Sequence, residues 1–128
     1  MGEGKLIHGD LTGKILGCVR DVHARLGPGL LETAYRKCLV GRLGAAKLGV
    51  RVEVPVPIRM DDVLVECGFR ADLIVENAVL VELKSVERLL PIHESQLLTY
   101  LKLSGLRVGL LVNFNSISFS DSFRRYVR

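Results

Sequence analysis

Hydrophobic residues recur at two spacings along the chain, and each spacing predicts a different kind of element. Over residues 11–26 they recur every three or four positions, which predicts a helix that Asp10 or Thr12 caps and that the Gly-Pro-Gly of residues 27–29 ends. The same spacing predicts a second helix over residues 30–43. Its expected core stripe consists of Leu31, Ala34, Tyr35, Cys38 and Leu39.

The middle of the chain changes to alternation, which is typical of strands. Residues 50–60 alternate between apolar and other positions, and Pro55 and Pro57 restrict the predicted strand to a sheet edge or an irregular run. A pair of aspartates then predicts a turn. The returning strand begins at Val63, and we expect Gly68 to kink or bulge it.

The last third of the chain predicts one more helix and one buried strand. Residues 91–103 begin with proline and stop before Ser-Gly, as a helix does, and residues 106–114 are almost continuously apolar, as in a strand buried on both faces. A short strand over 117–119 and a terminal helix over 122–128 are expected to follow. The predicted fold class is therefore mixed α/β (α+β), one domain spanning residues 1–128, with helices flanking a mixed central sheet.

Residues 69–84 carry the most informative polar side chains, because two apolar runs there surround Asn77. In a hairpin centred on Asn77, Asp72 lies opposite Glu82. Alternation then predicts one face that carries Arg70, Asp72, Ile74, Leu80, Glu82 and Lys84, and another that carries Ala71, Leu73, Val75, Val79, Val81 and Leu83.

Two carboxylates opposed on one sheet face repel each other, since their Cβ atoms are roughly 5 Å apart. A divalent cation such as Mg²⁺, which prefers oxygen ligands, would offset that repulsion. Lys84 would point its ammonium at the same space. These residues alone support a second interpretation equally well: a solvated sheet face on which acids and a lysine alternate with aliphatic residues.

The composition narrows the function only slightly. A net charge of +4 and a pI near 9.2 fit either an anionic partner or an ordinary surface, and the basic residues form no long tract. Aromatic residues at 5% with no Trp argue against a stacking platform for single-stranded nucleic acid. The three cysteines and three histidines lack zinc-ligand spacing.

The chain also lacks the patterns that direct a protein to or through a membrane. No signal peptide and no apolar run of membrane-spanning length are evident, so we expect a cytoplasmic protein with no membrane partner. The mean hydropathy of +0.30 leaves room for a buried homodimer or partner-protein contact.

Four separated motifs occur in the order of a known family. Residues 29–35 contain Gly-x-x-Glu-x-x-Tyr, Asp72 lies on one predicted strand, residues 82–84 read Glu-Leu-Lys on the next, and residues 93–101 read His-Glu-Ser-Gln-Leu-Leu-Thr-Tyr-Leu. Together they resemble the GxxExxY proteins of the PD-(D/E)XK nuclease superfamily, over about residues 15–113. The resemblance implies the restriction-endonuclease-like α-β-β-β-α-β core of that superfamily.

The resemblance also implies a metal-dependent phosphodiesterase site. Asp72 and Glu82 would ligate Mg²⁺ or Mn²⁺, and the backbone carbonyl of Leu83 would add a ligand. Lys84 would position the attacking water or stabilise the charge that develops in the transition state. Glu32 resembles a helical acid that completes the metal shell in one branch of the superfamily; its competing role is a favourable charge at a helix N-terminus.

The third predicted helix would contribute to substrate binding. Gln96 and Tyr100 lie one turn apart and resemble a Gln-x-x-x-Tyr motif that contacts the substrate backbone, although packing would explain either residue equally well. The predicted function is a Mg²⁺-dependent nuclease whose partner is nucleic acid, with DNA favoured over RNA. The alternatives are a nucleic-acid-binding or regulatory module that keeps the scaffold without cleaving and, more weakly, hydrolysis of a small phosphoester.

Overall fold

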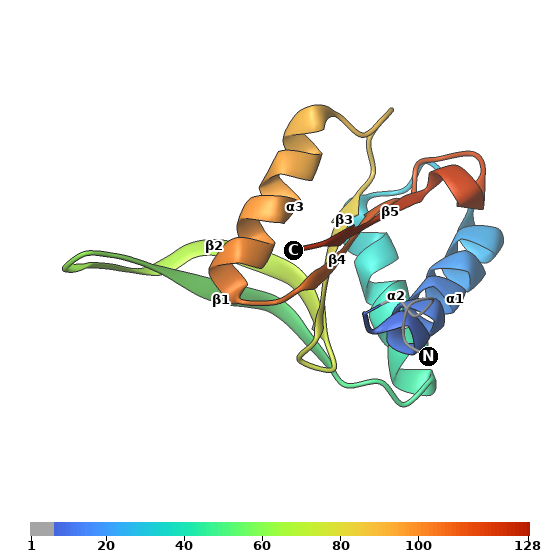
Figure 1. Cartoon of the computed structure of the whole chain (residues 1–128). Coiled ribbons are helices and arrows are strands. Elements are labelled where there is room, and N and C mark those ends of the chain that lie inside the picture. Colours follow the sequence, from blue (N-terminus) through green and yellow to red (C-terminus); the bar gives the residue numbers. More distant parts are fainter. Residues whose placement is uncertain (1–6) are drawn as a thin grey trace.

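The computed structural model describes residues 7–128, so residues 1–6 of the predicted domain, and most of the segment in which we expect no signal peptide, lie outside it. Nine elements follow one another along the described chain (Figure 1). They are α1 (Gly9–Leu26), α2 (Glu32–Ala45), β1 (Val50–Met60), β2 (Val63–Val75), β3 (Val79–Lys84), α3 (Pro91–Ser104), β4 (Val108–Asn113), the 3-10 helix η1 (Phe119–Asp121) and β5 (Phe123–Val127).

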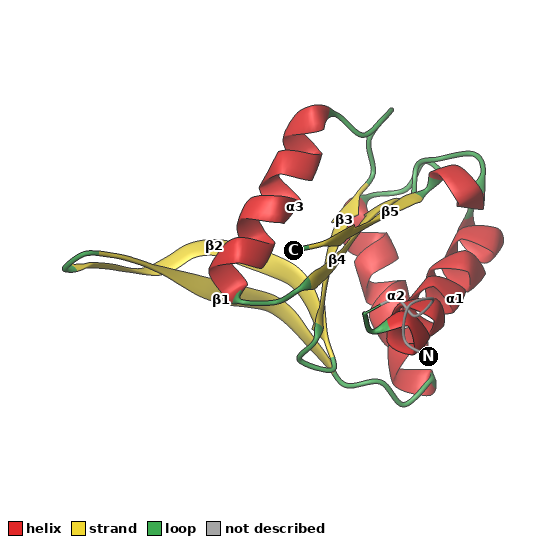
Figure 2. Cartoon of the chain, viewed as in Figure 1, coloured by secondary structure: helices red, strands yellow, loops and turns green. Residues whose placement is uncertain are grey.

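The strands form one mixed five-stranded sheet in the order β1-β2-β3-β4-β5. Only the β3–β4 pair is parallel, and α3 makes the crossover between its strands. Helices α1 and α2 lie together on one side of the sheet and α3 lies on the other (Figures 1 and 2). The fold class and the element order α-β-β-β-α-β from α2 to β4 are therefore confirmed.

Side chains alternate along β3, so this strand contributes to the core on both faces of the sheet. Val79, Val81 and Leu83 pack in the cluster that contains α1 and α2, whereas Leu80 packs against α3. The side chains of buried β4 also alternate between the two faces. On the face that packs against α3, Gly109 leaves room for the helix, because a Cβ there would lie 3.0 Å from Leu97 Cδ1. Both faces of these two strands are thus covered, as their continuous apolar character predicts.

The first helix begins differently from the prediction. His8 occupies the N-cap position in a left-handed conformation, and no side chain caps the helix. Asp10 lies in the first turn, and Thr12 bonds from its hydroxyl to the Gly9 carbonyl at 3.1 Å. Neither predicted cap is correct, because the helix starts before both residues.

The core stripe of α2 was only partly predicted. Tyr35, Leu39 and Leu43 are fully buried, whereas Leu31 and Cys38 are exposed. Leu31 is the extended residue before the helix, so helical periodicity does not orient it, and Cys38 lines an open hollow between α1 and α2. Tyr35 packs as expected, with its ring stacked on Phe114 at 4.6 Å between centroids.

The hairpin of β1 and β2 extends well beyond the sheet (Figure 1). β1 is an edge strand, as its prolines predict. The register shifts near Gly68, where an added Cβ would lie 2.1 Å from Ile58 Cδ1, so the predicted kink is confirmed. We call residues 57–70 the outer ribbon; nearly all of its side chains are exposed.

The C-terminal prediction was wrong. No strand forms over residues 117–119, where a 3-10 turn begins at Phe119, and residues 123–127 form β5 where a helix over 122–128 was expected. β5 pairs antiparallel with β4, which is buried and needs hydrogen-bond partners on both sides. A strand meets that need, and a helix would not.

Candidate active site

The predicted hairpin register holds, and it brings two carboxylates together. Leu73 pairs with Val81 and Ile74 with Leu80, so Asp72 follows directly opposite Glu82. The backbone ladder between β2 and β3 stops at Leu73. Beyond that point side chains replace it: the Asp72 N–H donates to Glu82 Oε2 at 2.7 Å, and the Leu83 N–H donates to Asp72 Oδ2 at 2.8 Å.

One face assignment in this hairpin was wrong. Ala71 was expected to share a face with Leu73, yet it packs with Val56 in the α3 cluster, whereas Leu73 packs with α1 and α2. Glu53, next to this point on β1, has a left-handed φ of 50°. Simple alternation does not extend through such a distortion, so the two strands turn relative to the sheet at the level of Asp72.

Burial makes both carboxylates hard to ionise. Only 6% of Glu82 is exposed, and burial first, then the charge of Asp72, raises the pKa of Glu82 to about 8. Burial also raises the pKa of Asp72, although its hydrogen bond from Leu83 and the charge of Lys84 oppose the rise. The protein therefore holds two acids in a place that disfavours their negative charge.

Lys84 and Glu32 lie beside this pair. The charge of Lys84 lowers the pKa of Asp72, Glu82 and Glu32 alike, so its ammonium is near all three. Glu32 opens α2, and burial, then Asp72, raises its pKa. Ser85 helps to hold the loop before α2 at the end of β3, because its hydroxyl donates to the Leu30 carbonyl at 2.7 Å.

The acidic side chains of the site do not form a complete set of metal ligands. Within residues 7–128, no three or more His, Cys, Asp or Glu side chains converge closely enough to hold a metal ion. Glu32 is thus within electrostatic range of Asp72 and Glu82 without joining them in one ligand shell. The structure brings together two of the three predicted carboxylate ligands.

The backbone of Leu83 faces the space beside Asp72 and Glu82. The Lys84 carbonyl accepts a hydrogen bond from the Phe114 N–H at 3.0 Å, which turns the peptide groups of Lys84 toward β4. Alternation then turns the N–H and C=O of Leu83 toward β2. The Leu83 N–H is taken by Asp72, and its carbonyl points into the gap that the end of the ladder leaves.

The donor set fits a hard divalent cation. Asp72 Oδ1 and Glu82 Oε1 take part in none of the hydrogen bonds or ion pairs within the described chain, while the other oxygen of each carboxylate is held in place. Two fixed carboxylates and one carbonyl offer only oxygen atoms, which are the ligands of Mg²⁺ and Mn²⁺. A cation there would also offset the buried like charges.

Helix α3 covers the Asp72–Glu82 pair on its own side of the sheet. Tyr100 stacks on Phe69 with ring centroids 3.9 Å apart, and burial, then the charges of Glu82 and Asp72, raises the pKa of its phenol. Tyr100 therefore lies near both acids. Gln96 is half-buried one turn earlier on the same helix, and none of the hydrogen bonds within residues 7–128 uses its side chain.

Arg36 is a neighbour of the site that the motifs missed. It forms an ion pair with Glu53 at 3.0 Å, and its charge lowers the pKa of both Asp72 and Glu32. The available signal was its position four residues after Glu32, which places both on one face of α2. The site then contains four acidic side chains, Glu32, Glu53, Asp72 and Glu82, beside two basic ones, Arg36 and Lys84.

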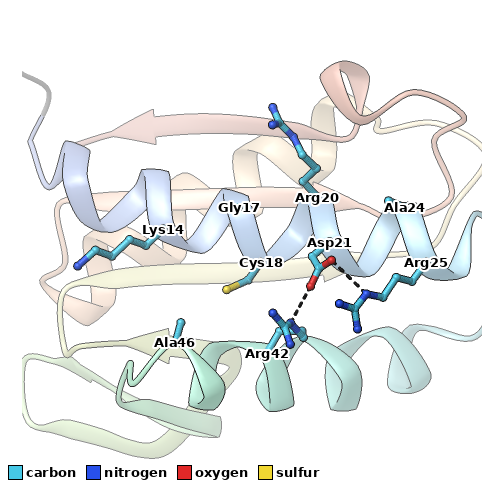
Figure 3. A pocket seen from close by; sticks show the side chains of 9 residues that line it. All are labelled: Lys14, Gly17, Cys18, Arg20, Asp21, Ala24, Arg25, Arg42 and Ala46. Atoms are coloured by element: carbon cyan, nitrogen blue, oxygen red, sulfur yellow. Dashed lines mark ion pairs between the residues drawn. The ribbon is translucent and has the colours of Figure 1, made fainter.

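A separate hollow lies elsewhere and is not assigned this chemistry. A cavity of about 560 Å³ lies between α1 and α2, and none of the predicted site residues lines it. In Figure 3 Asp21 lies between Arg25 and Arg42, to which it is ion-paired at 3.1 and 2.8 Å. The Asp21–Arg42 ion pair joins the two helices.

The described helices offer no route through a bilayer, since none of them is both long and apolar enough to cross a membrane.

Comparison with known proteins agrees with the geometry of the site. The family model described as the PD-(D/E)XK nuclease superfamily matches residues 9–126, which is nearly the whole chain. No significant match exists among curated proteins or among solved structures. Nucleases of this superfamily generally depend on divalent metals. With an acid on β2, a Glu-Leu-Lys on β3 and the matching order of elements, the chain belongs to the PD-(D/E)XK nuclease superfamily.

Proposed function

We propose that this protein is a Mg²⁺- or Mn²⁺-dependent nuclease of the GxxExxY type that hydrolyses phosphodiester bonds in nucleic acid, with DNA favoured over RNA. The observation that supports it most is the opposed pair Asp72 and Glu82. Each has one oxygen held by the neighbouring strand and one oxygen unengaged, next to Lys84. A buried pair of this kind is destabilising without a cation, which makes a structural role alone a poor explanation.

Asp72, Glu82 and the Leu83 carbonyl would hold the metal ion. When bound, the ion supplies a Lewis acid for a phosphoryl oxygen and lowers the pKa of a bound water. Lys84 then places a positive charge where negative charge develops on the phosphate in the transition state. Glu32 would act through an intervening water, since it does not converge with the other two acids.

The substrate would lie between α2 and α3, over the end of β3. Tyr100 and Gln96 would contact its sugar-phosphate backbone from α3, and Arg36 would add a positive charge from α2. A net charge of +4 supports an anionic partner. We expect the protein to act in the cytoplasm, and a homodimer or a partner protein to extend its short substrate-binding surface.

The test is a cleavage assay with a matched pair of variants. The purified protein is incubated with labelled single- and double-stranded DNA and RNA in Mg²⁺ or Mn²⁺, beside Glu82→Gln and the exposed control Glu87→Gln. We expect Glu82→Gln to lose at least about 100-fold in rate and Glu87→Gln to match the unchanged chain. Equal cleavage by all three proteins would assign the activity to a contaminant and contradict the proposal.

One observation favours a second candidate, a nucleic-acid-binding or regulatory module that does not cleave. Within the described chain, no third His, Cys, Asp or Glu side chain joins Asp72 and Glu82 in a ligand cluster. Calorimetric titration with Mn²⁺ separates the two functions. A nuclease binds the ion and loses that binding in Glu82→Gln, whereas a module without catalytic role has no reason to bind it at Asp72 and Glu82.

A further inference from the structure

Residues 27–31, the loop between α1 and α2, lead directly to Glu32 of the candidate site. Helix α2 begins at Glu32 without a side-chain cap, and Leu30 and Leu31 are 43% and 78% exposed, so apolar packing does little to hold the loop. Gly29 has a φ of 102°, a conformation that favours glycine. Polar contacts of this loop must therefore fix the place where α2 begins.

Tyr35 supplies one set of these contacts. Its ring is fully buried and stacked on Phe114, while its hydroxyl donates to the Gly27 carbonyl at 2.5 Å and accepts from the Leu30 N–H at 3.1 Å. One oxygen atom thus ties both ends of the loop to the first turn of α2. The stacked ring does not need this oxygen in order to pack, so the hydroxyl has a role separate from the core.

Ser85 supplies the other set from the end of β3. Its hydroxyl donates to the Leu30 carbonyl at 2.7 Å. The next residue is fixed as well: the Val86 N–H and carbonyl bond to the side-chain amide of Asn113, each at 3.0 Å, and Asn113 is only 2% exposed. The two backbone polar groups of Leu30 are thus held by Tyr35 from α2 and by Ser85 from the end of β3.

These contacts give the Gly-x-x-Glu-x-x-Tyr spacing a physical meaning. Gly29 lets the loop turn, Glu32 lies within electrostatic range of Asp72, and Tyr35 fastens the loop from the same turn of α2. We propose that Tyr35 and Ser85 are positioning residues, which hold Glu32 at the metal site without touching the ion. This inference rests on the proposed function, because it gives Glu32 a part in binding the ion.

A thermodynamic cycle on Mn²⁺ affinity tests this role. Calorimetric titration compares the unchanged chain with Tyr35→Phe, Glu32→Gln and the double variant. Tyr35→Phe keeps the stacked ring and should raise the dissociation constant about tenfold, as the loss of a group that orients a ligand does. In the Glu32→Gln background the same substitution should change the constant by less than about twofold, because the acid that Tyr35 positions is already gone.

Tyr126→Phe is the matched control. It also removes a hydroxyl that donates a hydrogen bond, in this case to Glu94, and it should leave the Mn²⁺ affinity unchanged. Ser85→Ala should behave like Tyr35→Phe and lose most of its effect in the Glu32→Gln background. No loss in Tyr35→Phe, or losses that add in the double variant, would overturn the positioning role alone, whereas an unchanged chain that binds no Mn²⁺ would overturn the proposed function and this role with it.

Hydrogen exchange of the metal-free protein tests the loop itself. The Leu30 amide should exchange about tenfold faster in Tyr35→Phe, since one hydrogen bond is lost, and at an unchanged rate in Tyr126→Phe. This measurement does not involve the metal, so it separates an error about the loop from an error about the proposed function. Equal exchange in the unchanged chain and both variants would overturn the role of Tyr35, whatever the cleavage assay shows.

Discussion

Strand β2 passes through two environments within one element. Residues 71–75 are buried between helices on both faces of the sheet, whereas residues 63–70 are exposed on a projecting ribbon. Both stretches carry several aliphatic residues. The difference lies in what covers them, and Asp72 and Glu82 lie at the boundary, where the β2–β3 ladder ends. The candidate site thus lies where β2 leaves the buried core.

Removing a buried side chain from the inner stretch should have the largest effect. Leu73 is fully buried, so Leu73→Ala leaves a cavity and should lower the free energy of unfolding by about 2 to 5 kcal/mol. Urea denaturation followed by circular dichroism measures it. A loss below about 1 kcal/mol would mean that the inner stretch is no better packed than the ribbon.

The boundary acids should make stability depend on pH. The pKa of Glu82 rises from 4.5 to about 8 on folding, so between these values the folded chain holds a proton that the unfolded chain releases. Stability is therefore present at low pH and lost as pH rises through this window, by on the order of 5 kcal/mol without metal. The raised pKa values of Asp72 and Glu32 add in the same direction.

The variant Glu82→Gln isolates this effect, because glutamine keeps the shape and the acceptor oxygen but does not ionise. Thermal unfolding at pH 5 and pH 8 should show a much smaller difference for Glu82→Gln than for the unchanged chain. Mg²⁺ should restore stability at pH 8 only where Glu82 is present. An equal pH dependence in both proteins would place the titrating group elsewhere.

The bulge between the two stretches should show a smaller, coupled effect. Gly68→Ala places a methyl group about 2 Å from Ile58, so it should cost about 1 kcal/mol. Ile58→Ala removes the colliding atoms, and the double variant should recover most of that loss. A double-mutant cycle on the unfolding free energies measures the coupling, and simple additivity would indicate that the ribbon bends freely there.

The smallest effect is expected on the ribbon itself. Leu64→Ala removes a half-exposed side chain, so in dilute protein it should change the unfolding free energy by less than about 0.5 kcal/mol. A loss as large as that of Leu73→Ala would erase the contrast between the two stretches.

Local patterns predicted most of the fold. β1 has the predicted limits and α3 extends the predicted helix by one residue, since strong alternation and a proline start leave little choice. The failures share a cause. Leu31 and Cys38 match helical spacing yet are exposed, and residues 123–127 form a strand because β4 needed a partner. Local propensity carries no information about what packs on an element.

The candidate site, like the fold, was predicted only in part from the sequence. The hairpin centred on Asn77 placed Asp72 opposite Glu82 from the sequence alone, because side chains alternate and the turn sets the register. The sequence could not show that the ladder breaks there, or that each carboxylate takes an N–H from the other strand. It also did not show that Arg36 joins the site through Glu53.

By itself, the sequence determined the order of the core elements, the register of the central hairpin and the residue types at the candidate site, since spacing and turn chemistry act between near neighbours. Only the tertiary structure decided how deeply Glu82 is buried, how far Glu32 lies from it and which part of β2 is left uncovered. Those properties depend on helices and strands that are distant along the chain, and burial and electrostatics depend on everything that surrounds a group in space.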